Sequence, residues 1–262
     1  MSLRKYPRTP HLSGSALQRG DDPQTLPFSE WKGRHLVVEE KLDGANCGVS
    51  FGPDGELRLQ SRGHYLTGGG REKHFALFKT WAQTRASDLF DVLGTRYVLY
   101  GEWLYAKHTV FYDALPHYLH EFDLLDLESD RFLSTPARRG LLDGLGVLQV
   151  PVLHEGPLDH QEQLAGFIRP SLYKSDRWRE VLLEQAMATG QRPERVQLQT
   201  EDCDLSEGLY VKWEDEQHVL GRAKVVRQGF TQTLLDGDGH WHRRPILPNQ
   251  LAPGVDLFGG GS

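Results

Sequence analysis

The stretch that decides the interpretation of this chain is Leu36-Val37-Val38-Glu39-Glu40-Lys41-Leu42-Asp43-Gly44-Ala45-Asn46. It joins an apolar run to the segment Cys47–Phe51 through Gly44, whose lack of a Cβ lets the backbone turn tightly. This pattern predicts a strand, a tight turn and a second strand, with Lys41 at the end of the first strand. A lysine between carboxylates is usually only a surface charge, so the remaining sequence must show whether Lys41 has a chemical role.

Bulk composition describes an ordinary globular protein. The 262 residues are 38% hydrophobic, which is enough for one large domain or two small ones. No apolar run is long enough to span a bilayer, and the basic N-terminus is not followed by the apolar stretch of a secretory signal. The two cysteines, Cys47 and Cys203, are too few for a disulfide framework and favour a reducing, cytoplasmic location.

The net charge of −6 is unfavourable for a protein that grips nucleic acid, although a local basic patch matters more than the sum. Candidate basic patches are Arg4-Lys5-Arg8, Arg138-Arg139, Arg177-Trp178-Arg179 and His242-Arg243-Arg244. Each of them can equally be a solvated face. The segment around Tyr173, Lys174 and Trp178 could bind RNA by charge and stacking, but packing on the sheet is the preferred interpretation.

Apolar periodicity predicts antiparallel strands with helices inserted between them, which is an α+β fold. Residues 35–61 have the pattern of a three-strand meander, and Gly52-Pro53-Asp54-Gly55 is the turn between its last two strands. Further strands are expected at 97–103, 117–127, 208–213 and 218–226, the last two as a hairpin. Helices are expected at 72–93 with a break near Ser87, from Ser134-Thr135-Pro136 onward, and at 159–168 and 175–189.

The domain organisation follows from where this pattern begins and ends. Residues 1–30 are rich in Pro, Gly and Ser, and are expected to be an irregular basic lead-in of the same domain. Residues 31–245 form the predicted domain itself. Residues 246–262 end in Gly259-Gly260-Gly261-Ser262 and are expected to be a flexible tail. The Gly-rich loop at 64–71 lacks the spacing of a phosphate-binding P-loop.

Six short motifs follow one another along the predicted strands. They are Lys41-Leu42-Asp43-Gly44, Ser61-Arg62-Gly63, Tyr100-Gly101-Glu102-Trp103, Glu121-Phe122-Asp123, Glu207-Gly208-Leu209-Tyr210-Val211-Lys212 and Gly221-Arg222-Ala223-Lys224. In this order they resemble motifs I, Ia, III, IIIa, IV and V of the covalent nucleotidyltransferases, which include DNA ligases, RNA ligases and mRNA capping enzymes. In that superfamily the motif I lysine attacks the α-phosphate of a nucleotide and carries the nucleoside monophosphate as a phosphoramidate. The resemblance runs from about Val37 to Arg227.

One position helps to separate the branches of this superfamily. Asn46 stands where DNA ligases and capping enzymes typically have arginine, and this is similar to the RNA ligase 2-like and RNA-editing ligase branch. The lead-in Lys5-Tyr6-Pro7-Arg8-Thr9-Pro10-His11-Leu12 resembles that of bacterial stand-alone RNA ligases. The resemblance therefore implies an ATP-dependent RNA ligase with an ATP-grasp-like adenylation domain of antiparallel sheets. No OB-fold is expected, because too few residues follow Arg227 to form one.

The resemblance also implies a role for each motif residue. Catalysis is assigned to Lys41, Asp43, Glu207 and Lys224. Nucleotide binding is assigned to Glu40, Asn46, Arg62, Glu102, Phe122, Lys212 and Arg222, with the ring of Phe122 stacked on adenine. Mg²⁺ or Mn²⁺ would be held by Asp43, Glu102 and Glu207, mainly through waters, because hard cations take oxygen ligands.

The nucleophile needs a neutral amine, and a free lysine has a pKa of about 10.4. Arg222, Lys224 and a divalent metal are expected to lower the pKa of Lys41 by placing positive charge nearby. RNA ligases usually have two lysines in motif V, whereas the first is Arg222 here, which cannot share the proton chemistry of lysine. Without an OB-fold, pyrophosphate must be oriented by other groups, and the candidates are Arg4, Lys5, Arg8 and His11 of the lead-in.

The expected function is the sealing of RNA ends that carry a 3′-hydroxyl and a 5′-phosphate, including those of a nicked duplex, with ATP as substrate. An end-healing kinase or phosphatase is a candidate partner, and no membrane is involved. The enzyme alternatives are a DNA ligase and a capping-type guanylyltransferase, and Asn46 argues against both. The non-enzyme alternative is a pseudo-ligase that only binds nucleotides or RNA ends. Against it stands the joint presence of Lys41, Glu102, Glu207 and Lys224.

Overall fold

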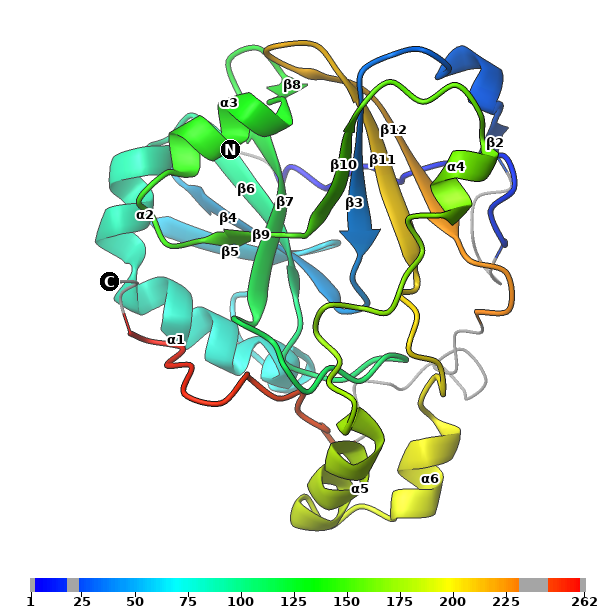
Figure 1. The fold of residues 1–262 in the computed structure, drawn as a ribbon. Helices are drawn as coiled ribbons and strands as arrows, with labels where there is room; N and C mark the ends of the chain where they lie inside the picture. Colours follow the sequence, from blue (N-terminus) through cyan, green and yellow to red (C-terminus); the bar gives the residue numbers. More distant parts are fainter. Residues whose placement is uncertain (1–2, 18–23, 231–244, 260–262) are drawn as a thin grey trace.

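The computed structural model describes residues 3–17, 24–230 and 245–259. In these residues, two six-stranded sheets stand side by side, with helices on the outer side of one sheet and below both (Figure 1). Most strand pairs are antiparallel, so the α+β prediction is confirmed. The patch His242-Arg243-Arg244 lies outside the described residues.

The first sheet has the strand order β10-β3-β11-β12-β1-β2. Its strands are β10 (Val152–Gly156), β3 (Leu36–Lys41), β11 (Gly208–Glu214), β12 (Val219–Val226), β1 (His11–Leu12) and β2 (Thr25–Leu26). The predicted hairpin is confirmed as β11 and β12, which pair antiparallel. The lead-in joins this sheet, because β1 pairs parallel with β12 through His11 and Lys224.

The second sheet has the order β5-β4-β6-β7-β8, with β9 beside β7. Its strands are β4 (Ala45–Phe51), β5 (Leu57–Ser61), β6 (Tyr97–Trp103), β7 (Leu119–Asp126), β8 (Arg131–Phe132) and β9 (Leu148–Gln149). The predicted meander over 35–61 is therefore wrong at its first step, because β3 and β4 belong to different sheets. The chain changes sheets at Gly44, where a Cβ would lie 2.8 Å from the carbonyl oxygen of Trp103.

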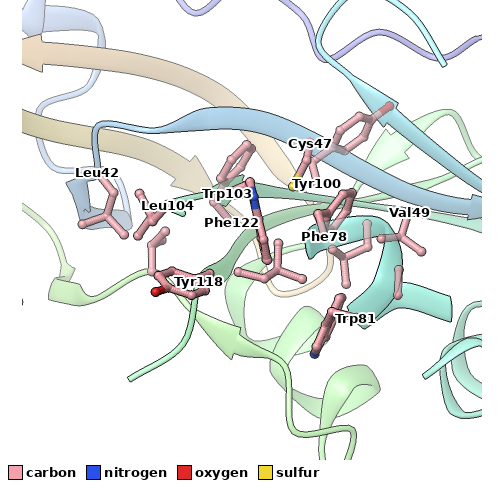
Figure 2. Packing of buried hydrophobic residues seen from close by; sticks show 14 of the residues in the cluster. Leu42, Cys47, Val49, Phe78, Trp81, Tyr100, Trp103, Leu104, Tyr118 and Phe122 are labelled. Atoms are coloured by element: carbon pink, nitrogen blue, oxygen red, sulfur yellow. The ribbon is translucent and has the colours of Figure 1, made fainter. Parts of the chain in front are cut away.

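Helices lie on the outer side of the second sheet, beside the first sheet and below both sheets (Figure 1). They are η1 (Phe28–Glu30), η2 (Gly70–Phe75), α1 (Ala76–Thr84), α2 (Ala86–Leu93), α3 (Thr135–Leu142), α4 (Glu162–Ala165), α5 (Trp178–Ala188) and α6 (Pro193–Leu198). The expected break in the helix over 72–93 falls at Arg85, between α1 and α2. Phe78 and Trp81 of α1 pack on the sheet beside Trp103, as Figure 2 shows. No helix of the described residues is long and apolar enough to cross a membrane.

The C-terminal stretch differs from the expected flexible tail. In residues 245–259, Asn249 is fully buried and joins two loops of the domain. Its Oδ1 accepts from the backbone nitrogen of Tyr112, and its Nδ2 donates to the carbonyl oxygen of Leu104. The Pro- and Gly-rich composition of this stretch predicted a flexible tail. Hydrogen bonds to backbone groups that are distant in the chain leave no local sequence pattern, so the sequence could not show that the stretch is packed. Residues 260–262 of the predicted tail lie outside the described residues.

Candidate active site

Lys41 lies at the end of β3, where the two sheets meet. Its Nζ donates to Oε2 of Glu207 at 2.8 Å, and the two side chains are 17% and 2% exposed. Glu207 immediately precedes β11, whose first residue, Gly208, is the cross-strand partner of Lys41. A Cβ on Gly208 would lie 2.0 Å from the carbonyl oxygen of Val225, so only glycine fits this position. The ion pair is thus fixed by strand register and remains within reach of a substrate.

Glu102 approaches the same lysine from the second sheet. It lies opposite Asn46 in the β4–β6 register, so the two side chains share one face of that sheet. Its Oε1 accepts a hydrogen bond from the Gly44 nitrogen at 3.0 Å. Burial raises the pKa of Glu102 to about 8, against the charge of Lys41. The Oδ1 atom of Asn46 is buried without a hydrogen-bond partner in the described part of the chain, which is a common feature of a ligand site.

Asp43 holds a neighbouring loop in place. Its Oδ2 accepts from the backbone nitrogens of Thr109 and Val110, each at 2.7 Å. Its own nitrogen donates to the hydroxyl of Tyr112 at 2.9 Å. Asp43, two residues after Lys41 in the chain, therefore holds the β6–β7 loop in position.

The carboxylates suit a divalent metal that keeps some of its waters. Within residues 3–17, 24–230 and 245–259, no three His, Cys, Asp or Glu side chains gather closely enough to hold a metal ion by themselves. Glu102 and Glu207 nevertheless flank Lys41 and offer the oxygen donors that Mg²⁺ and Mn²⁺ prefer. Burial raises the pKa of Glu207 to about 7, while the charge of Lys41 opposes this shift. A cation placed between these two buried carboxylates would relieve their mutual repulsion.

The charge around Lys41 favours its protonated form. Burial lowers the pKa of Lys41, but the nearby charges of Glu207, Tyr210 and Glu102 outweigh burial and raise the pKa above its usual value. The sequence had suggested that Arg222 and Lys224 would lower it. Lys224 acts on Glu207 instead, and Arg222 turns away from the site. Additional positive charge is therefore needed before Lys41 can become a nucleophile.

An aromatic wall lies next to the lysine. The rings of Phe122 on β7 and Tyr210 on β11 are parallel within 5°, with centroids 6.3 Å apart. Tyr6 of the lead-in packs edge-on against Phe122 at 5.0 Å. Burial raises the pKa of Tyr210, and Thr9, Lys41, Glu102 and Arg62 all act on its hydroxyl. Sequence reasoning missed Tyr210, although strand alternation places it on the same face of the sheet as Lys41.

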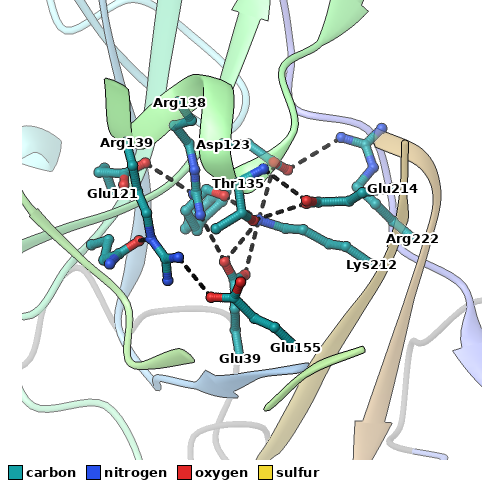
Figure 3. A network of polar contacts seen from close by, with 12 residues as sticks. Glu39, Glu121, Asp123, Thr135, Arg138, Arg139, Glu155, Lys212, Glu214 and Arg222 are labelled. Atoms are coloured by element: carbon teal, nitrogen blue, oxygen red, sulfur yellow. Dashed lines mark hydrogen bonds and ion pairs between the residues drawn. The ribbon is translucent and has the colours of Figure 1, made fainter. Parts of the chain in front are cut away.

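Lys212 and Arg222 belong to a buried charge network beside the site (Figure 3). Lys212 is 1% exposed, and its Nζ contacts Glu39 at 2.9 Å, Asp123 at 3.2 Å and the carbonyl oxygen of Phe122. Arg222 contacts Asp123 at 3.3 Å, and its guanidinium lies over the ring of Phe132. These two cations fix Asp123 and the backbone of Phe122, and neither of them approaches Lys41.

The predicted site residues thus fall into two groups. The structure gathers one group around the end of β3: Lys41, Asp43, Asn46, Arg62, Glu102, Phe122, Glu207 and Lys224. The other group, Glu40, Lys212 and Arg222, lies away from Lys41. Lys212 and Arg222 belong to the buried charge network, and Glu40 lies elsewhere. It projects from the opposite face of β3, beside Ser171 and Lys174, and burial raises its pKa to about 7. Nucleotide contact by Glu40, Lys212 and Arg222 stays a prediction.

Solved RNA ligases share this fold. A lysine-to-methionine mutant of the Naegleria gruberi RNA ligase with AMP and Mn matches with a TM-score of 0.51 and 19% identity, covering 76% of this chain and 51% of that chain. A glutamate-to-alanine mutant of the N. gruberi ligase with ATP and Mn matches with a TM-score of 0.52 and 19% identity, covering 86% and 58%. An archaeal ATP-dependent RNA ligase matches with a TM-score of 0.51 and 20% identity, covering 88% and 49%.

At identities this low, the structural likeness shows a common fold and nothing more. The chain spans about half to three-fifths of the length of these ligases. No curated protein matches it. The family model for RNA ligase, however, matches residues 34–226, which contain strands β3 to β12, Lys41 and both flanking carboxylates, Glu102 and Glu207. The chain therefore belongs to the RNA ligase family.

Proposed function

We propose that this chain is an ATP-dependent RNA ligase that forms a covalent AMP adduct on Lys41. The observation that carries the proposal is the Lys41 amine, held 2.8 Å from Glu207 and beside Glu102, next to the parallel rings of Phe122 and Tyr210. This arrangement suits a nucleophilic lysine: the amine can reach the phosphate of a nucleotide, and the aromatic rings can contact its nucleobase.

The chemistry proceeds in three displacements at phosphorus. The Lys41 amine attacks the α-phosphorus of ATP, a nitrogen–phosphorus bond forms, and the bond to the β-phosphate oxygen breaks to release pyrophosphate. A 5′-phosphate oxygen of RNA then attacks the same phosphorus and releases the lysine. Finally an RNA 3′-hydroxyl attacks the 5′-phosphorus, loses its proton and releases AMP. Positioning and charge stabilisation are the main tasks of the protein in such transfers.

The residues around Lys41 supply that positioning. A bound Mg²⁺ or Mn²⁺ supplies positive charge that neutralises the triphosphate and favours the neutral amine. Lys224 neutralises phosphate oxygens next to Glu207, and the Asn46 amide contacts phosphate. Glu102 and Arg62 hold the ribose, while adenine lies against the Phe122–Tyr210 wall.

The matched structures support ATP and a divalent metal for this chain, since two N. gruberi ligase mutants carry AMP or ATP with Mn and the archaeal ligase is ATP-dependent. The proposed partner is RNA with 3′-hydroxyl and 5′-phosphate ends, including those of a nicked duplex. Asn46 favours the RNA ligase 2-like and RNA-editing branch and, with the lead-in, the bacterial stand-alone type. We place the activity in the cytoplasm, where an end-healing kinase or phosphatase would prepare the ends.

A sealing assay tests this function. Nicked duplexes with either an RNA or a DNA strand at the 3′-hydroxyl side are incubated with ATP or GTP and Mg²⁺. The proposal expects joining of the RNA 3′-hydroxyl strand with ATP and no joining by Lys41→Ala. Preferred joining of DNA would make the chain a DNA ligase. Use of GTP without joining would make it a capping-type enzyme, and binding without any covalent step would make it a pseudo-ligase.

A further inference from the structure

A cavity lies beside the loop that Asp43 anchors. This cavity of about 240 Å³ is lined by Lys107 and His108 of the β6–β7 connection, Arg192 and Arg195 at α6, and Ile246 and Leu247 of the C-terminal stretch. Figure 1 shows α6 next to α5 below the two sheets, at the end of the molecule to which β3 points. His74 of η2 also lines it, so the cavity is built from four segments that are far apart in the sequence.

Hydrogen bonds connect this cavity to the reactive lysine. Asp43, two residues after Lys41, accepts from the backbone nitrogens of Thr109 and Val110. Lys107 and His108, which come directly before that pair, form the cavity wall. Burial lowers the pKa of His108, and the charges of Asp43 and Lys41 reach its ring, so the wall and the lysine are close. A ligand in the cavity would thus lie on the same loop that Asp43 holds beside the site.

The wall is completed by contacts that fix the Lys107 side chain. Its Nζ donates to the carbonyl oxygens of His108 at 2.9 Å and of Gln199 at 2.6 Å. Its backbone nitrogen donates to the carbonyl oxygen of Leu247 at 2.8 Å. These bonds join the β6–β7 connection, the end of α6 and the C-terminal stretch, so the cationic wall is preorganised.

The charges at the cavity differ from those on the neighbouring helix. Arg177 of the predicted basic patch pairs with Glu180 and Glu184, and Arg179 pairs with two aspartates, Asp202 and Asp204. Trp178 between them is buried, so this patch is neutralised and packed. Arg192 and Arg195, in contrast, form no ion pair with any residue of the described ranges. Unneutralised arginines beside a cavity favour an anionic ligand, and guanidinium groups match phosphate oxygens.

We infer that this cavity is a subsite for a backbone phosphate of the RNA strand whose end reacts at Lys41. RNA is named as the ligand on the strength of the proposed ligase function, whereas the preference for a phosphate follows from Arg192 and Arg195. The volume of the cavity is about 240 Å³. It is several times the roughly 30 Å³ share of one water, which leaves room for a phosphate with part of its ribose.

The test measures RNA affinity in the absence of ATP. The probe is a short, fluorescently labelled single-stranded RNA, titrated at several salt concentrations with the parent chain and with Arg192→Ala/Arg195→Ala. Affinity should fall about tenfold, and the slope of log K against log salt should shrink by about 0.7, the share of the one phosphate that the two arginines neutralise. The matched control is Arg177→Ala/Arg179→Ala, which removes the same charge from the neutralised patch and should change affinity less than about twofold.

A charge-retaining variant separates recognition from folding. Arg192→Lys/Arg195→Lys should keep the parental salt slope and bind within about threefold of the parent, even if the alanine pair proves unstable. Parental affinity in the alanine pair, equal loss in the control pair, or loss in the lysine pair would each overturn the inference. So would a parent chain that does not bind the RNA. The sealing assay reports on the proposed function separately, because no ATP is present in the binding measurement.

Discussion

Replacing Lys212 by methionine tests whether this lysine stabilises the fold or binds the nucleotide. Methionine keeps much of the side-chain length but removes the charge that Glu39 and Asp123 share. Losing one partner of a buried ion pair costs about 3–5 kcal/mol, because the remaining charge is left uncompensated. Arg138 still contacts Glu39, and Arg222 still contacts Asp123, so neither carboxylate is left alone. We therefore expect the free energy of unfolding to fall by about 3 kcal/mol at neutral pH, at the low end of that range.

The same substitution has a predicted pH dependence. Burial disfavours the Asp123 carboxylate, but Lys212 and Arg222 outweigh burial and hold its pKa below the usual value. A carboxyl group with a lowered pKa stabilises the fold above its unfolded pKa of about 3.9, and this contribution is lost as the pH falls through the folded pKa. The difference between Lys212→Met and the parent should thus be largest at neutral pH and shrink at acid pH.

Urea unfolding of the parent, of Lys212→Met and of the control Lys32→Met measures both effects. Lys32 is exposed, so its replacement should change stability by less than about 0.5 kcal/mol. A loss below about 1 kcal/mol at neutral pH, or one that persists undiminished in acid, would show that Lys212 does not stabilise the fold through its ion pairs. Parental stability combined with loss of ATP binding would instead identify Lys212 as a nucleotide ligand.

Substitutions at three further positions give independent predictions. Burial raises the pKa of Glu102 to about 8, so between about pH 4.5 and 8 the folded protein keeps a proton that the unfolded chain has released, and its stability falls as pH rises through this range. Glu102→Gln should therefore unfold with about 1 kcal/mol more free energy than the parent above about pH 8 while losing AMP labelling, and lower stability there would contradict this. Asn249→Ala strands the backbone groups of Tyr112 and Leu104, and should cost about 2–4 kcal/mol in urea unfolding; a cost under about 1 kcal/mol would be inconsistent with a packed C-terminal stretch. Tyr210→Ala should weaken ATP binding about tenfold by calorimetry, whereas Tyr210→Phe stays within about threefold, and equal effects would exclude stacking.

The position of the strands could be predicted from the sequence, but their partners could not. Alternating and apolar runs predicted β6 and the β11–β12 hairpin close to their observed ends. An apolar run such as Leu36–Val38 indicates burial without naming its neighbours, so β3 was grouped with β4, which follows it in the chain. Its observed partners, β10 and β11, come from distant segments that are brought together only by tertiary packing.

The candidate site shows the same division. Lys41, Glu102 and Glu207 meet as the motif resemblance implied, because short motifs at strand ends are held by strand register. The direction of Arg222 could not be predicted, since it depends on Asp123 and on the ring of Phe132. The same holds for the loop held by Asp43 and for the pKa of Lys41. These properties arise from charges and amides that approach only in the folded chain.

Covalent labelling tests the central claim most directly. The purified chain is mixed with Mg²⁺ and ATP radiolabelled at the α-phosphate, denatured and separated by electrophoresis, alongside Lys41→Ala and the exposed-lysine control Lys32→Ala. We predict a label that survives denaturation on the parent and on Lys32→Ala and is absent from Lys41→Ala. An unlabelled parent, or equal label on Lys41→Ala, would contradict it.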